Sequence, residues 1–409
     1  MRPLKVLVSA YACEPGKGSE PEVGWQWVHQ IARFHQAWVL TRSNNRRAIE
    51  EALKQNPNPN LKFVYLDLPS WARFWKKGNR GVHLYYYMWQ ILSGVVARKL
   101  HSAIGFDLAH HVTFVNDWIG TGLSLVSCPL VWGPIGSHPF VENRYADFIG
   151  QYEKLHGYLR TFLRRSAPYR DPLYYRSVQK AKRILVINHE CLSMLPKKNL
   201  NKAIIMPQNA MPHDLIETSP KKATKNLKVI SIGRLVGFKG FRLTLKAYAS
   251  HEKRYPDSTL TIVGDGRQRN ELKELIESLN LKQKITFTGQ LPRDQVLKII
   301  DEHSVFLFPS FEGAGMVVIE AMARGLPVVC LDFGGPGEYV TEDCGIKVPL
   351  TEPDQVVAGL ADALNRLASD SALYERLSAG AIARVRDHFT WDHIGDRLNE
   401  IYQEVLKST

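Results

Sequence analysis

Paired cysteines, long apolar runs and the glycine fingerprint of dinucleotide-binding proteins are all missing from this sequence. The five cysteines are widely spaced and include no C-x-x-C pair, which indicates a reducing compartment and no zinc site. The longest uncharged run, residues 81–97, reaches only the lower limit of a membrane span and contains polar residues, so a surface or core helix is expected there. The absence of G-x-G-x-x-G argues against the usual NAD or FAD site.

Acidic residues are also scarce in two stretches of the first half. The net charge of +13 indicates an anionic partner, such as a nucleotide diphosphate, a membrane surface or nucleic acid. Residues 154–183 contain one acid, and residues 68–106 contain none. The cations of the acid-free stretch are Arg73, Lys76, Lys77, Arg80, Arg98 and Lys99.

Aromatic residues accompany these cations. Trp71, Phe74 and Trp75 alternate with them, and a helical face follows that consists of Tyr85, Met88, Trp89, Leu92 and Val96. Basic residues near an anionic leaflet and aromatic rings in the headgroup layer both favour binding. We therefore expect residues 68–106 to dock on an anionic membrane. The alternative is that the helix packs in the core and the cations form a solvated face.

Short apolar segments that end in glycine, proline or polar residues recur along the chain. In the first half they lie at 4–10, 37–40, 63–66, 108–112, 130–132, 184–187 and 203–206. In the second half they begin near 229, 260, 285, 305 and 326, and the chain is helical from residue 354. Strands that alternate with helices predict an α/β protein with mostly parallel sheets. The first strand should run into a glycine loop, residues 14–24, before a helix that begins near Trp25.

The most informative stretch is 308–330, which predicts a strand end, a loop, a helix and another strand. Pro309 ends the strand, Gly313 and Gly315 let the backbone turn tightly, and helical spacing runs from Met316 to Arg324. A glycine turn that feeds a helix N-terminus leaves several amide groups unpaired, with the helix dipole behind them. This arrangement predicts a phosphate site.

Charged residues surround the predicted phosphate site. Because carboxylates repel phosphate, we expect Glu312 and Glu320 to accept hydrogen bonds from sugar hydroxyls instead. The alternative is that Glu320 is a solvated helix residue beside an ordinary turn. Arg234 and Lys239 follow another strand that ends in glycine, and they form a candidate diphosphate clamp or, alternatively, two solvated surface cations.

The pattern Glu312-x7-Glu320, followed by Ala-Met-Ala-x-Gly-x-Pro-Val-Val, resembles the retaining, nucleotide-sugar-dependent glycosyltransferases of group 1, often called family 4. The resemblance covers nearly the whole chain and is weakest between residues 68 and 182. It implies the GT-B fold, with two Rossmann-like domains facing across a cleft. The N-terminal, acceptor-binding domain would be 1–208, completed by a last helix in 389–409 that crosses back, and the C-terminal, nucleotide-sugar-binding domain would be 209–388.

The resemblance also implies roles for individual residues. Arg234 and Lys239 would hold the diphosphate, Glu312 would contact the transferred sugar, and Glu320 would bind the donor ribose. Charge stabilisation of the leaving group would need no protein nucleophile, because the leaving phosphate assists deprotonation of the acceptor. The other implied donor-binding residues are Gly18, Ser19, Gly233, Gly264, Gly289, Gly313, Ala314, Gly315, Met316 and Val317.

Two further features bear on catalysis. Many family members have a histidine after the strand that ends at Trp132, whereas this sequence has Gly133-Pro134. The role is therefore left to His111, to His138 or to backbone atoms alone. Asp-x-Asp, the metal-diphosphate signature of the other large glycosyltransferase fold, is absent, so we expect no metal and no cofactor.

We expect a retaining glycosyltransferase of the hexosyltransferase type that acts in polysaccharide, lipopolysaccharide or glycolipid synthesis. Its partners would be a nucleotide-sugar, a lipid-linked or saccharide acceptor and an anionic membrane surface. We expect it in the cytoplasm, bound peripherally to the inner face of the membrane. A nucleotide-sugar epimerase or phosphorylase on the same fold is the alternative enzyme. A nucleic-acid-binding protein is a third possibility, but no recognition module is identifiable and the basic stretches lie in one domain.

Overall fold

The computed structural model describes residues 2–76, 78 and 81–407. The chain forms two compact units: unit 1 consists of Met1–Ser137, Phe162–Gln208 and Trp391–Thr409, and unit 2 consists of His138–Thr161 and Asn209–Thr390. Residues 138–161, which the sequence analysis placed with the N-terminal domain, thus cluster with unit 2. The chain passes back from unit 2 to unit 1 inside one helix, α6 (Gln151–Arg170).

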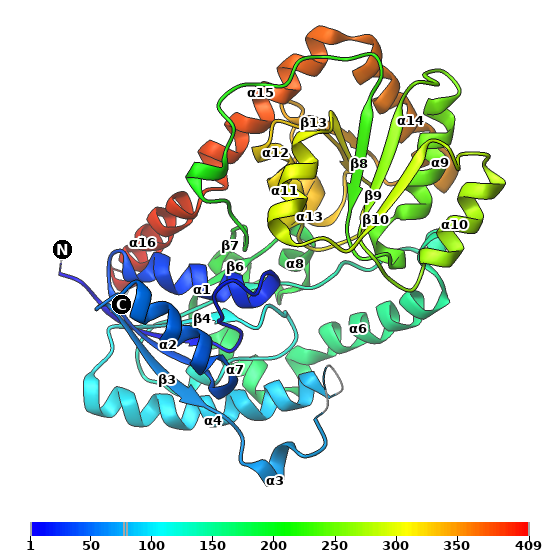
Figure 1. Ribbon diagram of the computed structural model, residues 1–409. Helices are drawn as coiled ribbons and strands as arrows, with labels where there is room; N and C mark the ends of the chain where they lie inside the picture. Colours follow the sequence, from blue (N-terminus) through cyan, green and yellow to red (C-terminus); the bar gives the residue numbers. More distant parts are fainter. Residues whose placement is uncertain (1, 77, 79–80, 408–409) are drawn as a thin grey trace. The chain divides into compact units, whose positions relative to one another are not determined.

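Unit 1 is built on a seven-stranded sheet whose neighbouring strands are all parallel (Figure 1). The order β3-β2-β1-β4-β5-β6-β7 reverses between β1 and β4. The strands are β1 Lys5–Ala10, β2 Gln36–Arg42, β3 Leu61–Leu66, β4 Leu108–Thr113, β5 Leu130–Ile135, β6 Ala181–Val186 and β7 Ala203–Ile205. Besides part of α6, the helices are α1 Ser19–Ala32, α2 Arg46–Gln55, α3 Ser70–Arg73, α4 Val82–Ile104, α7 Pro172–Lys180, α8 His189–Met194 and α16 Trp391–Lys407.

Unit 2 repeats this plan with six parallel strands in the order β10-β9-β8-β11-β12-β13, which reverses between β8 and β11. The strands are β8 Lys228–Ile232, β9 Thr259–Val263, β10 Ile285–Gly289, β11 Val305–Phe308, β12 Val328–Leu331 and β13 Gly345–Val348. The helices are α5 Ala146–Ile149, α9 Phe241–Glu252, α10 Arg269–Ser278, α11 Arg293–Asp301, α12 Met316–Ala323, α13 Gly334–Tyr339, α14 Pro353–Ser369 and α15 Ser371–His388. The expected fold class, two parallel α/β sheets, is confirmed.

The last helix packs within unit 1. Arg33, which follows α1, pairs with Asp392 at 3.1 Å and with Asp396 at 3.3 Å on α16. Gly395 lies so close to α1 that an added Cβ would be 2.5 Å from Oε1 of Gln30. The prediction that the C-terminal helix belongs with the first domain is therefore confirmed.

Two sequence-based expectations about elements were wrong. Helix α1 begins at Ser19 rather than near Trp25. Pro21 does not delay its start, because proline is tolerated in the first turn of a helix. Gly24 lies inside the helix, where the absence of a side chain allows close packing. An added Cβ on Gly24 would lie 1.9 Å from the carbonyl oxygen of Ala12. Strand β13 was not expected, because it is only four residues long, lies at the sheet edge and contains a lysine.

The helical face expected to meet a membrane is partly core. Tyr85 and Trp89 on α4 are fully buried, and the indole of Trp89 donates to the carbonyl of Leu66 at 3.3 Å. These two rings therefore pack against the sheet, as the alternative interpretation of this stretch held. Trp71 and Phe74 in and after α3 are exposed, whereas Lys77 and Arg80 lie outside the described residues.

One cation of the second basic stretch is also internal. The guanidinium of Arg164 on α6 is fully buried, and its Nε donates to both oxygens of Asp117 at 2.9 Å. Its Nη1 donates to Glu190 at 2.7 Å. Arg164 is thus neutralised inside unit 1, where it fixes the second half of α6, and it contributes nothing to attraction of an external anion.

We predict that Asp117→Asn destabilises the protein by about 3 kcal/mol, because it leaves the buried Arg164 with half of its counter-charge. Urea-induced unfolding followed by tryptophan fluorescence measures this. The control is Glu51→Gln, which breaks the solvent-exposed pair with Arg47 and should leave stability nearly unchanged. Equal effects of the two substitutions would contradict the prediction.

Candidate functional site

The candidate site lies where the strand order of unit 2 reverses. In open α/β sheets, ligands bind beyond the carboxyl ends of the two strands at this switch point, here β8 and β11. The loop after β8 ends in a short 3-10 turn, Gly237–Lys239, and the loop after β11 leads to α12. The amide of Phe311 in the second loop donates to the carbonyl of Phe238 in the first at 2.7 Å. The two loops are therefore joined by a backbone hydrogen bond that does not depend on their side chains.

A buried ion pair joins the same loops. The ammonium of Lys239 donates to Oε2 of Glu312, and both side chains are nearly buried. Burial raises the pKa of Glu312, while Lys239 and then Arg234 act in the opposite direction. The other carboxylate oxygen of Glu312, Oε1, is buried and accepts no hydrogen bond from the described residues. It is placed to accept one from a ligand hydroxyl.

The start of α12 offers amide donors beside this pair. Its N-cap, Gly315, has no side chain that could accept from the first amides of the helix. Gly315 has a φ of −174°, an extended conformation open to any residue, so the expected tight turn does not explain this glycine. An added Cβ would lie 3.5 Å from Oε1 of Glu312. The tightest contact would be with Cγ2 of Val318, at 3.2 Å, so a side chain at Gly315 would crowd the first turn of α12, next to Met316 and Val317.

Glu320 is not a solvated helix residue. It is buried on α12, and its Oε1 accepts from Nε of Arg293 at 3.0 Å. Burial raises the pKa of Glu320, and the neighbouring Arg293 opposes that shift. Sequence reasoning missed Arg293, because it is the first residue of α11 and nothing in its local pattern connects it with a helix 27 residues later.

Three glycines form the adjoining edge of the sheet. Gly233, Gly264 and Gly289 follow or end the neighbouring strands β8, β9 and β10. Gly264 has a φ of 134°, and an added Cβ would lie 2.0 Å from the carbonyl oxygen of Gly233. Its amide donates to the carbonyl of Gly289 at 2.8 Å. Side chains are thus kept away from this edge, where the family resemblance implies donor-binding residues.

The candidate histidines differ in their surroundings. His138 is in unit 2, and its ring lies 4.6 Å from that of Phe238 in the loop that carries Lys239. His111 is in unit 1, buried on β4, and its Nε2 lies 3.3 Å from the hydroxyl of Tyr86. Burial lowers the pKa of His111 to about 4, so its imidazole is neutral near pH 7. Of the two, only His138 shares a unit with Lys239 and Glu312.

The remaining predicted residues, Gly18 and Ser19, belong to the start of α1 in unit 1. Gly18 is the N-cap with a φ of 69°, and Ser19 also has a positive φ, 51°. Sequence reasoning passed over the next residue, Glu20, whose carboxylate accepts from the amide of Val115. Burial raises the pKa of Glu20 to about 8. Glu20 lies in the predicted glycine loop, but nothing in the sequence singled it out, because a glutamate in a loop is ordinarily solvated.

Comparison with known proteins gives a family match for part of the chain and similar solved structures for nearly all of it. Residues 213–384 match the sequence profile of the family described as glycosyl transferases group 1. They make up nearly all of Asn209–Thr390, the longer of the two segments of unit 2. Alpha-D-kanosaminyltransferase of Streptomyces kanamyceticus is 30% identical over 179 residues, which is 43% of this chain and 45% of that protein. A GDP-mannose-dependent monoacylated alpha-(1-6)-phosphatidylinositol monomannoside mannosyltransferase of Corynebacterium glutamicum is 30% identical over 204 residues, 47% of this chain and 52% of that protein.

The chain thus spans about half the length of the curated relatives it matches. A solved structure, that of Anabaena HepE in complex with UDP and glucose, superposes with a TM-score of 0.61 at 18% identity and covers 98% of this chain and 100% of that one. Such a likeness shows the fold. Residues 213–384 carry the sequence pattern of the group 1 glycosyltransferases, in a chain whose two parallel α/β units have the GT-B fold.

Proposed function

We propose that this protein is a retaining glycosyltransferase that moves a sugar from a nucleoside diphosphate sugar to the hydroxyl of an acceptor. The observation that carries the proposal is the cluster at the switch point of unit 2: Lys239, Glu312 with one unused buried oxygen, and the amides at the start of α12. Cations and amides suit a diphosphate, and a buried carboxylate oxygen suits a sugar hydroxyl. The cluster lies within the residues that match the group 1 family.

In this proposal each group has one task. Lys239 and Arg234 balance the charge that develops on the leaving diphosphate, and Oε1 of Glu312 accepts a hydrogen bond from the transferred sugar. Glu320, held by Arg293, accepts from the ribose hydroxyls. Because Glu312 is paired with Lys239, it is a binding group and not a nucleophile. The leaving phosphate then takes the acceptor proton on the same face of the sugar, which preserves the anomeric configuration.

We predict that Lys239→Ala and Arg234→Ala each lower kcat by about a hundredfold, because a preorganised charge at the leaving group is lost. Glu320→Ala should raise the donor KM more than it lowers kcat. Turnover of a panel of UDP- and GDP-sugars with and without lipid extract measures these effects, and NMR of the product reports its anomeric configuration. The control is Lys273→Ala, an exposed lysine on α10. Near-normal rates of both clamp variants at saturating donor would refute the assignment.

We expect activity to survive excess EDTA, because Lys239, Arg234 and the α12 amides can balance the charge of the leaving diphosphate. The measurement is turnover after dialysis against chelator, with and without added manganese. Loss of activity that manganese restores would contradict this expectation.

The acceptor is proposed to be membrane-presented, and α6 supports this. The exposed face of this helix contains six apolar or aromatic side chains with exposed fractions between 42% and 92%: Tyr152, Leu155, Tyr158, Leu159, Phe162 and Tyr169. The charged residues Glu153, Lys154, Arg160 and Arg164 lie instead on the covered side of the helix. A helix with its apolar face toward solvent needs a partner for that face.

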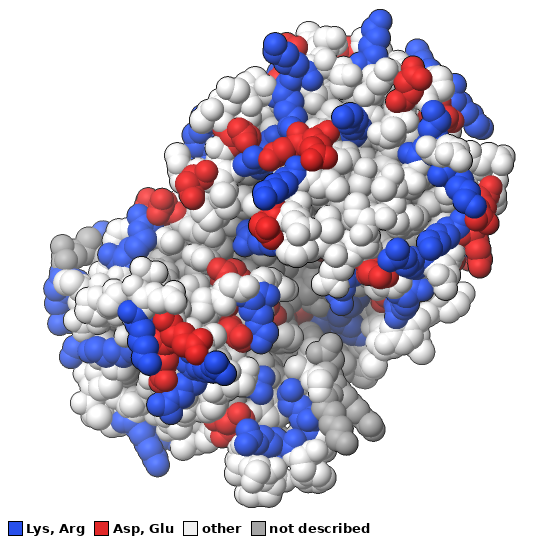
Figure 2. Space-filling view, viewed as in Figure 1, with Lys and Arg blue, Asp and Glu red and all other residues white. Residues whose placement is uncertain are grey.

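The charged residues beside this apolar face indicate what kind of partner it binds. The only acid of α6 is Glu153 on the covered side, whereas Arg165 and Arg170 are exposed beside the apolar side chains. An acid-free apolar face flanked by cations suits an anionic bilayer. Near α3, Trp71 and Phe74 are exposed, but Arg73 between them pairs with Asp67 at 2.9 Å, so this part of the face in Figure 2 carries charges of both signs. Among the described residues, no helix has the length and apolarity to cross a bilayer. The five cysteines are buried free thiols, which suits the cytoplasmic side of the membrane.

We predict that the protein sediments with vesicles that contain phosphatidylglycerol and not with neutral phosphatidylcholine vesicles, and that salt weakens binding. The triple variant Leu155→Ser, Leu159→Ser, Phe162→Ser should bind at least about tenfold more weakly, because each buried side chain contributes about 1.5–3 kcal/mol. Leu200→Ser, on an exposed leucine elsewhere in unit 1, is the control. If the triple variant sediments like the parent protein, α6 is not the docking helix.

A further inference from the structure

Polar side chains stand at the carboxyl ends of three neighbouring strands of unit 1. Tyr11 follows β1, Arg42 is the last residue of β2, and Asp67 follows β3. Because these strands are adjacent and parallel, their carboxyl ends share one edge of the sheet. The strand order reverses between β1 and β4, so this edge borders the switch point of unit 1, where open α/β sheets bind ligands.

Arg42 is the unusual member of this group, because its guanidinium lacks an acid partner. Its Cζ lies 5.2 Å from the ring centre of Tyr11 and 5.0 Å from that of Tyr85 on α4, so two aromatic rings hold it. Its Nε is buried without a hydrogen-bond partner, and no carboxylate of the described residues pairs with it. The side chain as a whole is half-buried and thus open to solvent in part. A guanidinium that is held in place with unused donors suits an anion.

The nearest acid, Asp67, is already engaged by other groups. Its Oδ2 accepts from Nη1 of Arg73 at 2.9 Å. Its Oδ1 accepts from the amide of Leu68 at 2.9 Å and from the hydroxyl of Tyr85. Asp67 is therefore the counter-charge of Arg73, and Arg42 is left without one.

A second cation lies over the same tyrosine ring. Nζ of Lys76 is 5.3 Å from the ring centre of Tyr85, and it donates to the carbonyl of Gly78 at 3.2 Å. Among the described residues, no carboxylate pairs with Lys76 either. Burial lowers the pKa of Lys76 and nearby Arg42 lowers it further, while Asp67 acts in the opposite direction. The two cations therefore repel each other, and an anion bound to both would remove that repulsion.

Arg46 shows what an arginine at this edge does when it has an acid. It begins α2, four residues after Arg42, and its Cζ also lies over a tyrosine, 5.3 Å from the ring centre of Tyr65. Unlike Arg42, it pairs through Nε with Glu50 at 2.8 Å. Arg46 is therefore a matched control: an arginine on an aromatic ring whose charge is already balanced.

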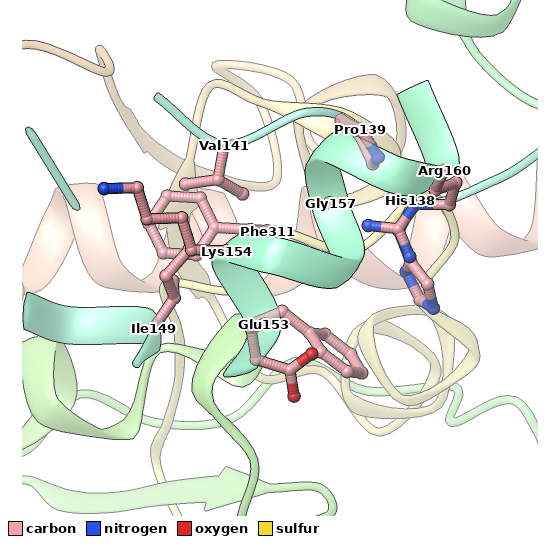
Figure 3. A pocket seen from close by; sticks show the side chains of 10 residues that line it. His138, Pro139, Val141, Ile149, Glu153, Lys154, Gly157, Arg160 and Phe311 are labelled. Carbon is pink, nitrogen blue, oxygen red and sulfur yellow. The ribbon is translucent and has the colours of Figure 1, made fainter. Parts of the chain in front are cut away.

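The pocket in unit 2 that Figure 3 shows is of a different kind. It has room for about one water molecule. Its acid, Glu153, pairs with Arg267, and its His138 and Arg160 also have partners. Arg42 and Lys76, in contrast, have no acid to balance them.

We propose that Arg42 and Lys76 form an anion site in unit 1 that binds the phosphate group of a ligand, in a different unit from the candidate diphosphate site. Guanidinium and phosphate match in shape and charge, and an ammonium beside them adds a second donor. That the ligand is the acceptor rests on the proposed function and deepens it, because the acceptor then carries a phosphate ester. A lipid headgroup and a water-soluble ester share this chemistry.

The test is calorimetry on the full chain with saturating UDP, which keeps the probe out of the nucleotide site. The probes are glycerol 1-phosphate and, as its neutral match, glycerol. We expect glycerol 1-phosphate to bind about tenfold or more tightly than glycerol, because charge-assisted hydrogen bonds contribute at least that factor. Added salt should weaken the binding.

Substitutions locate the binding. Arg42→Gln should weaken it about tenfold or more, Arg42→Lys should restore it in part, and Arg46→Gln should leave it unchanged. Because Arg42 also packs on two rings, its loss can lower stability without any ligand. The rise in Tm that glycerol 1-phosphate causes is therefore measured for each variant, and only the variants of Arg42 should lose it.

Sedimentation with phosphatidylglycerol vesicles separates the two sources of phosphate. If the site takes a lipid headgroup, Arg42→Gln lowers sedimentation and glycerol 1-phosphate competes with the vesicles. If it takes a soluble ester, Arg42→Gln abolishes binding of glycerol 1-phosphate and leaves sedimentation unchanged.

The remaining outcomes distinguish this site from the proposed function. Absence of glycerol 1-phosphate binding together with unchanged sedimentation of Arg42→Gln overturns the site, and so does equal weakening by Arg46→Gln. Both leave the glycosyltransferase proposal standing. Phosphate binding that depends on Arg42, in a protein that turns over no nucleotide-sugar, overturns the acceptor assignment and keeps the anion site.

Discussion

The ion pair between Lys239 and Glu312 is the constraint on which the candidate site depends. It ties together the two loops that leave the sheet of unit 2 at its switch point, and it does so where both side chains are nearly buried. A buried ion pair often adds little net stability to a fold, because desolvation offsets the attraction between its charges. This pair also leaves Oε1 of Glu312 buried and unsatisfied among the described residues, which costs about 1–3 kcal/mol. An arrangement that is unfavourable for stability is what the proposed binding of a donor sugar at this site would require.

Much of the fold could be predicted, because parallel strands are nearly continuous apolar runs and their glycine ends are local signals. The glycine-to-helix transition at Met316 and the return of the last helix were both predicted. Features that depend on distant contacts could not be predicted. Gly24 was taken for a loop residue, since its contact with Ala12 exists only after the first strand and helix pack.

The candidate site was predictable where its residues follow strand ends, and not where partners come from elsewhere. Lys239, Glu312 and Glu320 were found from local patterns, whereas Arg293 was not, because its partner lies on a different helix. Charge counting also overestimated the basic surface. Arg164 counts toward the net charge of +13, yet it is neutralised inside unit 1. Of the cations of α6, Arg165 and Arg170 are exposed, beside apolar side chains that also face solvent. Composition cannot show which way a helix faces.

The allocation of residues 138–161 to unit 2 has a consequence for how this protein can be divided. Tyr145, Phe148 and Ile149 from that segment belong to the hydrophobic core of unit 2. Ile149 packs so closely on Gly237 that a Cβ added to Gly237 would lie 1.7 Å from the carbonyl oxygen of Ile149. The family profile begins at residue 213 and so omits them. A recombinant fragment cut to that profile would lack part of its own core and expose apolar surface. Unit 2 is discontinuous in sequence, and it can be made alone only by grafting the earlier segment back.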